Sequence, residues 1–119
     1  MTSSQDSACL FCRIVSGEIP STVIYSDDLV IAFRDLNPQA PLHALIIPRA
    51  HVAGIDAVEP GHGDILAAMA QAANAIARNE HVAESGFRLV MNAGPDAGQS
   101  VFHLHMHILG GRKLGWPPG

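Results

Sequence analysis

Residues 101–109 read V-F-H-L-H-M-H-I-L, the most distinctive stretch of the chain. In a β-strand successive side chains point to opposite faces, so a strand over residues 100–109 would place His103, His105 and His107 on one face. The apolar residues between them would share the other face and pack against a helix. Histidine rarely fills a core, and a buried imidazole needs hydrogen-bond partners. Three histidines at a period of two therefore indicate a functional site.

The three histidines are compatible with two kinds of chemistry. Alternating histidines on a strand bind zinc when a further ligand comes from elsewhere in the chain. Alternatively, one imidazole is a nucleophile, while its neighbours orient it and handle protons. His105 has a histidine two residues away on each side, and this central position favours the nucleophile hypothesis.

The composition restricts the classes of protein to which the chain can belong. It has 119 residues, of which 48% are hydrophobic and 15% charged, so we expect one compact domain. The net charge is −4, and the cations are Lys113 and six scattered arginines. No basic run could neutralise several phosphates of a polynucleotide, so we expect no nucleic-acid partner.

The sequence also gives expectations about location. No apolar stretch approaches the roughly 20 residues of a membrane span, so we expect no membrane association. Residues 1–8, MTSSQDSA, are polar and lack the pattern of a signal peptide, so we expect a disordered tail on a cytoplasmic protein. In the cytoplasm Cys9 and Cys12 are expected to be thiols or metal ligands rather than a disulfide.

Hydrophobic periodicity and turn residues predict an α+β protein. The turn over residues 26–28 is short, which favours antiparallel pairing of the strands on either side. We therefore expect a five-stranded, mainly antiparallel sheet with one short and one long helix. The expected elements are a helix over 10–16, strands over 22–25, 29–34 and 43–47, a helix over 59–81, and strands over 87–92 and 100–109.

Residues 103–108, H-L-H-M-H-I, match the H-φ-H-φ-H-φ motif of the histidine triad (HIT) superfamily. The sequence resembles the Hint branch of that superfamily over nearly the whole chain from Cys9 onward. The resemblance implies a HIT-like fold, a single domain over residues 9–119 and a sheet that continues across a homodimer. The other matching blocks are 14–20 (IVSGEIP), 32–35 (AFRD), 38–41 (PQAP), 43–51 (HALIIPRAH), 98–101 (GQSV), 110–112 (GGR) and 116–119 (WPPG).

The same resemblance implies an activity. Members of the Hint branch hydrolyse purine nucleoside 5′-phosphoramidates, in which AMP or GMP is joined to an amine through a P–N bond. By position, His105 would be the nucleophile and would form a covalent nucleotidyl-histidine intermediate. The leaving amine needs a proton, for which His107 and Ser100 are the candidate donors, with His43 in the same proton network.

The resemblance also implies a nucleotide site. Taken alone, Asp35 could be a turn residue, Ile14 and Phe33 plain core, and Asn92 a turn-former. In the family pattern Asp35 accepts hydrogen bonds from the ribose hydroxyls, as acidic residues do in other nucleotide sites. The expected base slot consists of Phe11, Ile14, Ile19, Phe33 and Leu36. The expected phosphate contacts come from Asn92, Gly98, Gln99, Ser100, Val101, His105 and His107.

Cys9 and Cys12 form a C-x-x-C motif, which alone is a weak signal. By resemblance, however, Cys9, Cys12, His51 and His103 occupy positions that bind zinc in some bacterial relatives. A Cys₂His₂ set offers zinc the tetrahedral ligands that it prefers. We expect such a zinc to be structural, with no cofactor needed for catalysis.

Two alternatives stay open at this point. One is a dinucleoside polyphosphate hydrolase of the same superfamily, against which the ending GGR…WPPG argues. The other is a non-catalytic nucleotide- or zinc-binding interaction protein, against which the intact His105 argues. Residues 113–119 contain the only tryptophan, Trp116, followed by two prolines. By resemblance to the Hint dimers, we expect this tail to help select the amine.

Overall fold

The structure is a computed structural model, and it describes residues 8–119. Residues 1–7 lie outside the described part of the chain, and with them all but Ala8 of the tail expected over residues 1–8. Within residues 8–119, no helix has the length and apolar character needed to cross a membrane.

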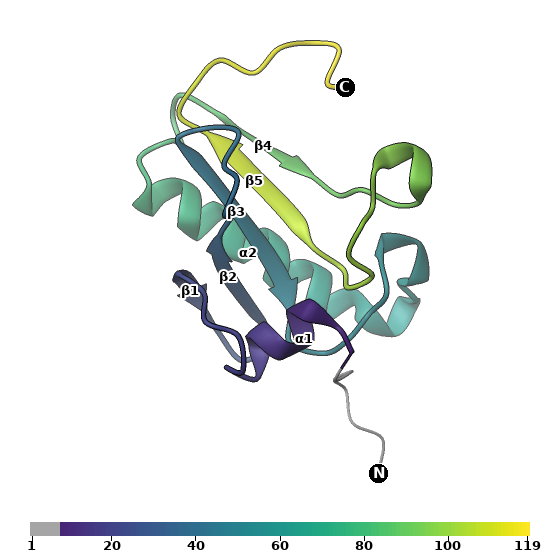
Figure 1. Cartoon of the computed structure of the whole chain (residues 1–119). Coiled ribbons are helices and arrows are strands. Elements are labelled where there is room, and N and C mark those ends of the chain that lie inside the picture. Colours follow the sequence, from purple (N-terminus) through teal and green to yellow (C-terminus); the bar gives the residue numbers. More distant parts are fainter. Residues whose placement is uncertain (1–7) are drawn as a thin grey trace.

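The described elements follow the predicted order of a short helix, three strands, a long helix and two strands (Figure 1). Every strand pair is antiparallel, and the spatial order is β1-β2-β3-β5-β4. The predicted α+β class with a five-stranded antiparallel sheet is therefore confirmed. The bounds are α1 Leu10–Val15, β1 Val23–Ser26, β2 Val30–Arg34, β3 Leu42–Pro48, α2 Gly63–Asn79, β4 Phe87–Val90 and β5 Met106–Gly110.

One face of the sheet is covered by α2, which runs behind the strands in Figure 1. The buried residues of α2 recur at helical spacing, and most of them are alanines. Ala72, Ala73 and Ile76 are at most 1% exposed and belong to one cluster with Ala44 and Ile108 of the sheet. Small side chains on both sides let helix and sheet approach closely. Burying a side chain such as Ile76 contributes about 1.5–3 kcal/mol.

The opposite face has a smaller apolar cluster beneath α1. Phe11 of α1 contacts Phe33 of β2 edge-on, with ring centroids 5.6 Å apart. Leu45 of β3 is paired with Phe33 on one side and with His107 of β5 on the other. Because α1 has only six residues, it covers only part of this face. His43, two residues before Leu45, shares the face, so polar functional side chains lie beside the apolar cluster.

The last strand is shorter than expected. It begins at Met106 rather than at residue 100, so the prediction was wrong for residues 100–105. Met106 is paired with Ile46 of β3, two residues before that strand ends at Pro48. Before Met106, the N–H of Leu104 donates to the carbonyl of Val52 rather than to β3, and Pro48 has no N–H to donate.

The long helix is also shorter than the predicted range of 59–81. A 3₁₀ turn, Pro60–His62, precedes α2, and Glu59 and His62 form a reciprocal cap at its start. At the other end His81 has a φ of 61°, a left-handed conformation that ends a helix. The other elements differ from their predicted ranges by at most two residues at either end.

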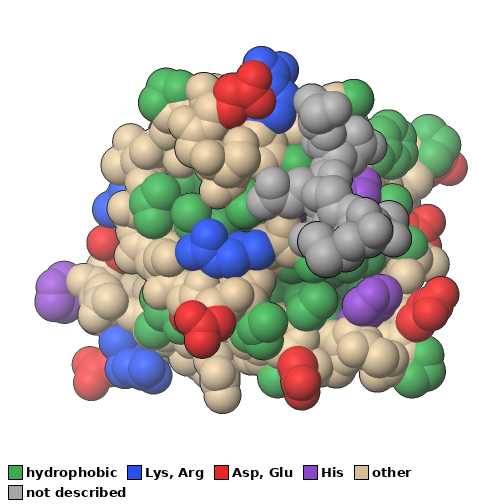
Figure 2. All heavy atoms as spheres, turned by 90° about the horizontal axis from the view of Figure 1, so that it is seen from below, with side chains coloured by type: hydrophobic (Ala, Val, Ile, Leu, Met, Phe, Trp, Pro, Cys, Tyr) green, Lys and Arg blue, Asp and Glu red, His purple; other side chains and the backbone are tan. Residues whose placement is uncertain are grey.

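The charged side chains on the face shown in Figure 2 are dispersed. Lys and Arg side chains alternate with Asp and Glu among hydrophobic and neutral ones, and the coloured residues form no continuous basic surface there. The expectation that no nucleic acid binds stays a prediction.

Candidate active site

The three histidines of the motif lie on one side of the chain, although only His107 belongs to β5. Phe11 contacts the rings of His103 and His105, with centroids 6.0 and 5.2 Å away. The rings of His105 and His107 are 5.3 Å apart. Leu104, between His103 and His105, is buried in the cluster beneath α2. The side chains therefore alternate between the two faces as predicted, although residues 103–105 lie before the start of β5.

His105 has one ring nitrogen engaged and the other available. Its Nδ1 lies 2.7 Å from the main-chain carbonyl oxygen of His103. A carbonyl only accepts, so Nδ1 carries the proton and donates it. In the neutral ring Nε2 then has an unprotonated lone pair, which is what a nucleophilic imidazole requires.

His43 and His107 form an ordered chain of hydrogen bonds that begins at a main-chain group. The N–H of Gln39 donates to Nδ1 of His43 over 3.0 Å. His43 therefore has its proton on Nε2, which donates to Nδ1 of His107 over 2.9 Å. His107 in turn keeps its proton on Nε2. The carboxylate of Asp35 lies 3.4 Å from Nε2 of His43. We call Gln39, His43 and His107 the proton network.

Burial keeps His107 neutral. Desolvation, together with the neighbouring His105 and His43, lowers the pKa of His107 from 6.5 to about 4, although Asp35 acts in the opposite direction. At neutral pH His107 is therefore an uncharged N–H donor. Asp35, His43 and His107 also offer ligand atoms within 4.8 Å of one another, but the hydrogen-bond order already accounts for their arrangement.

An apolar cavity of about 220 Å³ opens beside α1. Leu36, at its rim, is fully exposed. The sequence did not single out Leu10, Pro20 or Leu45 among its walls; Leu45 could have been found from its place two residues after His43 on the same strand face. The predicted slot residues Phe11, Ile14, Ile19, Phe33 and Leu36 all line the cavity, together with Asp35.

The loop after β4 contains the predicted phosphate contacts Gly98 and Gln99. Gln99 ties it down, because its side chain accepts from the N–H of Gly94 and donates to the carbonyls of Ala53 and Val101. Gly98 has a φ of 80°, which favours glycine.

Two further predicted phosphate contacts lie near the two ends of this loop. Asn92 follows the end of β4 and is partly buried. Ser100 is exposed and lines a separate hollow of about 460 Å³ with Cys9, His51 and Phe102. The structure therefore does not bring Ser100 into a hydrogen bond with the motif histidines.

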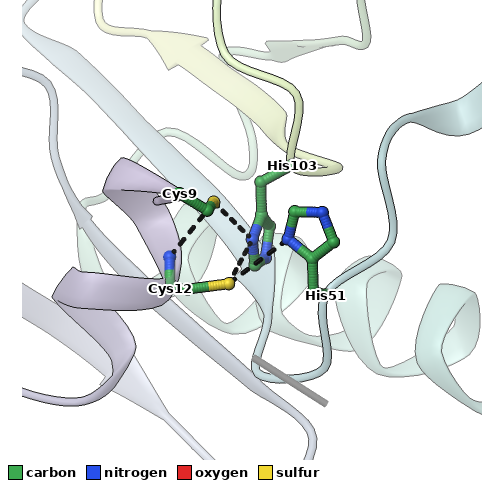
Figure 3. A group of neighbouring side chains, drawn as sticks. All are labelled: Cys9, Cys12, His51 and His103. Atoms are coloured by element: carbon green, nitrogen blue, oxygen red, sulfur yellow. Dashed lines mark hydrogen bonds between the residues drawn. The ribbon is translucent and has the colours of Figure 1, made fainter. Parts of the chain in front are cut away.

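Cys9, Cys12, His51 and His103 converge from α1, the segment after β3 and the segment before β5 (Figure 3). Their four ligand atoms all lie within 4.8 Å of one another. Sγ of Cys9 is 3.3 Å from Nδ1 of His103, and Sγ of Cys12 is 3.2 Å from Nδ1 of His51. We call these four residues the metal-ligand cluster.

The cluster fits zinc. His103, with no exposed surface, has its Nε2 2.8 Å from the carbonyl of Pro48, so Nε2–H donates and the Nδ1 lone pair faces the thiols. Burial lowers the pKa of His103 to about 4, which keeps that lone pair free at neutral pH. With zinc–sulfur and zinc–nitrogen bonds of about 2.3 and 2.0 Å, tetrahedral geometry requires S···N separations of about 3.5 Å. The observed separations of 3.2–3.5 Å are close to this value.

Comparisons with known proteins identify close relatives. "Adenylylsulfatase HINT1" of Arabidopsis thaliana is 48% identical over 116 residues, which cover 96% of this chain and 78% of that protein. The "14 kDa zinc-binding protein" of Zea mays is 48% identical and covers 96% and 90%. "Purine nucleoside phosphoramidase" of Escherichia coli K12 is 49% identical over 106 residues, covering 89% of each chain.

A solved structure and a family model agree with these relatives. The HIT family hydrolase from Legionella pneumophila Philadelphia 1 superposes with a TM-score of 0.91 at 49% identity, covering 93% of this chain and 99% of that chain. The family model described as "HIT domain" matches residues 16–114. Together with the arrangement of His103, His105 and His107, these matches show that the chain belongs to the HIT domain family.

Proposed function

We propose that this protein hydrolyses purine nucleoside 5′-phosphoramidates, with His105 as nucleophile. The observation that carries the proposal is the hydrogen bond from Nδ1 of His105 to the carbonyl of His103, which leaves Nε2 unprotonated. An N–H donor on His107 and an apolar cavity of about 220 Å³ lie close by. The names of the Arabidopsis and Escherichia relatives, an adenylylsulfatase and a phosphoramidase, support a nucleotide as substrate.

In the first step the purine occupies the slot, and Asp35 accepts hydrogen bonds from the ribose hydroxyls. Nε2 of His105 attacks phosphorus, and a P–N bond to the imidazole forms as the P–N bond to the amine breaks. Nε2–H of His107 donates to a phosphoryl oxygen, where negative charge develops. Asn92 and the main chain of residues 98–101 are proposed as further contacts to the phosphate.

The leaving amine takes up a proton as its bond to phosphorus breaks. His107 and the hydroxyl of Ser100 are the two candidate donors. Since both are neutral, each can pass its proton to the amine only as it takes up another from solvent or from the proton network. In the second step water attacks the nucleotidyl-histidine. Its oxygen bonds to phosphorus as the bond from phosphorus to Nε2 of His105 breaks, and its proton replaces the one that the amine took up. The nucleoside monophosphate leaves and His105 returns to its first state, so one difficult displacement becomes two easier ones.

The test compares two substrates on the purified protein. We expect turnover of an adenosine 5′-phosphoramidate to exceed turnover of a diadenosine polyphosphate. Denaturation at alkaline pH during turnover should trap a protein adduct with the mass of one nucleoside monophosphoryl group, absent from His105→Asn. Preference for the diadenosine polyphosphate would favour the other hydrolase branch, and nucleotide binding without turnover of either would favour a non-catalytic interaction protein.

The metal-ligand cluster is proposed to hold one structural zinc per chain. The name of the Zea mays relative, a zinc-binding protein, supports this assignment. Bound zinc would supply a cross-link between α1, the segment after β3 and the segment before β5, and it would take no part in the chemistry. Cys9 and Cys12 would hold it from α1, and His51 and His103 from the sheet side.

The assembly is proposed to be a homodimer of a single domain over residues 9–119, in the cytoplasm. β4 is an edge strand of the sheet, and its Leu89 is 40% exposed. An unpaired edge with an apolar side chain is suited to pairing with a second copy across a twofold axis. The tail with Trp116, which is 82% exposed, would then help to select the amine.

A further inference from the structure

Arg112, just after β5, holds the loop that precedes β3. Its Nε–H donates to the carbonyl of Gln39 over 2.9 Å, and its Nη1 donates to the carbonyl of Lys113, also over 2.9 Å. The two bonds hold the planar guanidinium in one orientation. Arg112 thus connects the end of the sheet to a peptide group 73 residues earlier in the chain.

A second observation shows that the two segments are built to lie together. Gly111 has a φ of 89°, and a Cβ added there would lie 2.9 Å from Cβ of Pro41. Only glycine combines this backbone conformation with so close an approach. The turn after β5 therefore packs directly on the loop that contains Gln39, and this contact brings Arg112 within reach of the Gln39 carbonyl.

Arg112 and the proton network meet at Gln39, through the two peptide groups on either side of its Cα. Arg112 binds the carbonyl of Gln39, and the N–H of Gln39 donates to Nδ1 of His43. His43 then donates from Nε2 to Nδ1 of His107. Each bond determines which nitrogen of the next ring has the proton, and the last proton stays on Nε2 of His107.

The loss of the first bond would change the last one. Without the bond from Arg112 to its carbonyl, Gln39 could rotate about its Cα and turn its N–H away. Nδ1 of His43 would then be open to a proton, and the tautomer with Nδ1–H would become accessible. Nε2 of His43 would then accept rather than donate, and His107 would place its own proton on Nδ1. Nε2 of His107 would present a lone pair to the phosphoryl oxygen, which is repulsive where a donor is needed.

We propose that Arg112 is a positioning residue for the hydrolase, acting through Gln39 and His43 on the tautomer of His107. The catalytic consequence rests on the proposed function, whereas the order of the hydrogen bonds is a property of the protein alone. The titratable groups that face His107 are His105, His43 and Asp35, and Arg112 acts on it only through the chain of hydrogen bonds.

The test replaces Arg112 with methionine, which keeps an unbranched stem and removes the guanidinium. In protein labelled with ¹⁵N-histidine, two-bond proton–nitrogen spectra report which ring nitrogen is protonated. Wild type should show the Nε2–H tautomer for His43 and His107, and Arg112→Met a mixture. General acid–base groups supply about 10²–10⁴-fold in rate, so we expect kcat to fall about tenfold while the Kd for AMP changes less than about twofold.

Two further variants make the test specific. Arg112→Lys can still donate to the Gln39 carbonyl, and it should restore part of kcat. Arg49 offers a matched control, because its Nε–H donates to the carbonyl of Asp27, also over 2.9 Å. The Asp27 turn joins β1 and β2, away from β5 in the strand order, so Arg49→Met should keep both tautomers.

The possible outcomes separate the proposals. Retention of both Nε2–H tautomers in Arg112→Met would overturn the positioning role. So would an equal weakening of AMP affinity and kcat with a lower Tm, because that pattern describes a loop that is merely destabilised. If wild type hydrolysed no phosphoramidate and Arg112→Met still showed mixed tautomers, the link from Arg112 to His107 would stand and the proposed activity would fail.

Discussion

The metal-ligand cluster and the proton network use the same residue type in opposite ways. His103 and His107 both have a pKa lowered to about 4, mainly by burial. His103 donates to the carbonyl of Pro48, so its free lone pair converges with the Cys9 and Cys12 thiols on one point. His107 accepts from His43, so a proton rather than a lone pair is left at its outer nitrogen. The partner of the second nitrogen decides between metal ligand and proton donor.

The largest effect is expected at His105. His105→Asn removes the nucleophile but keeps a polar side chain, so turnover should fall by about 10³-fold or more while AMP still binds. Initial rates with an adenosine phosphoramidate and calorimetric titration with AMP measure both. His62→Asn is the control, because the side chain of His62 caps the 3₁₀ turn before α2 and lies outside the candidate site. A His105→Asn protein with a tenth of wild-type turnover would contradict the assignment.

The metal-ligand cluster should respond in stability and metal content. Cys12→Ser removes a ligand whose Sγ faces both His51 and His103. The zinc content should be about one per chain in wild type and well below one in the variant. Lost metal binding removes several kcal/mol, and we expect Tm to fall by about 10 °C. Elemental analysis and thermal denaturation measure this, with chelator-treated wild type as the comparison. Zinc-free wild type with the Tm of untreated protein would contradict the proposal.

The proton network should leave a signature in the pH dependence of stability. His107 has a pKa of about 4 when folded, against about 6.5 when unfolded. The unfolded chain therefore binds more protons between these values, so stability is fully present above pH 6.5 and is lost as the pH falls toward 4. In His107→Gln this loss should be smaller, as chemical denaturation at several pH values would show. If the free energy of unfolding fell equally with pH in wild type and in His107→Gln, the side chain of His107 would lie in a more solvated site than the structure shows.

The smallest effect is expected for the tail. Deletion of residues 116–119 removes the exposed Trp116 but leaves β4 and α2 intact, so sedimentation should still give a dimer. Relative rates on phosphoramidates with different amines should change more than the affinity for AMP. An unaltered substrate profile would show that the tail does not select the amine, and a monomeric wild type would remove the dimer itself.

The local sequence pattern predicted most of the fold, because helices and strands follow from the periodicity of apolar side chains. The spacing of alanines in α2 and the alternation around Leu104 follow directly from helix and strand geometry. The start of β5 was missed, because strand length depends on the partner. Pairing with β3 stops at Ile46, and the N–H of Leu104 donates to the carbonyl of Val52, 52 residues earlier in the chain. Nothing near residue 100 signals this.

The sequence likewise predicted only part of the candidate site. The motif, with its resemblance to a family, singled out His105 and the four residues of the metal-ligand cluster as candidates, because imidazole and thiol groups are visible as residue types. The carbonyls of His103 and Pro48 and the N–H of Gln39 were not identified. Every residue has such main-chain groups, so their use depends on where the chain places them. Gly111 and Arg112 were noticed only as part of a matching block.

The sequence by itself determined the α+β class, the order of the elements, and the histidines and cysteines available for chemistry, since these follow from residue type and spacing. Only the tertiary structure decided which lone pair of each histidine is free. That choice depends on main-chain partners from distant segments, as in the bonds of His103 to Pro48 and of His43 to Gln39. A ring with two similar nitrogens has no role of its own until the fold engages one of them.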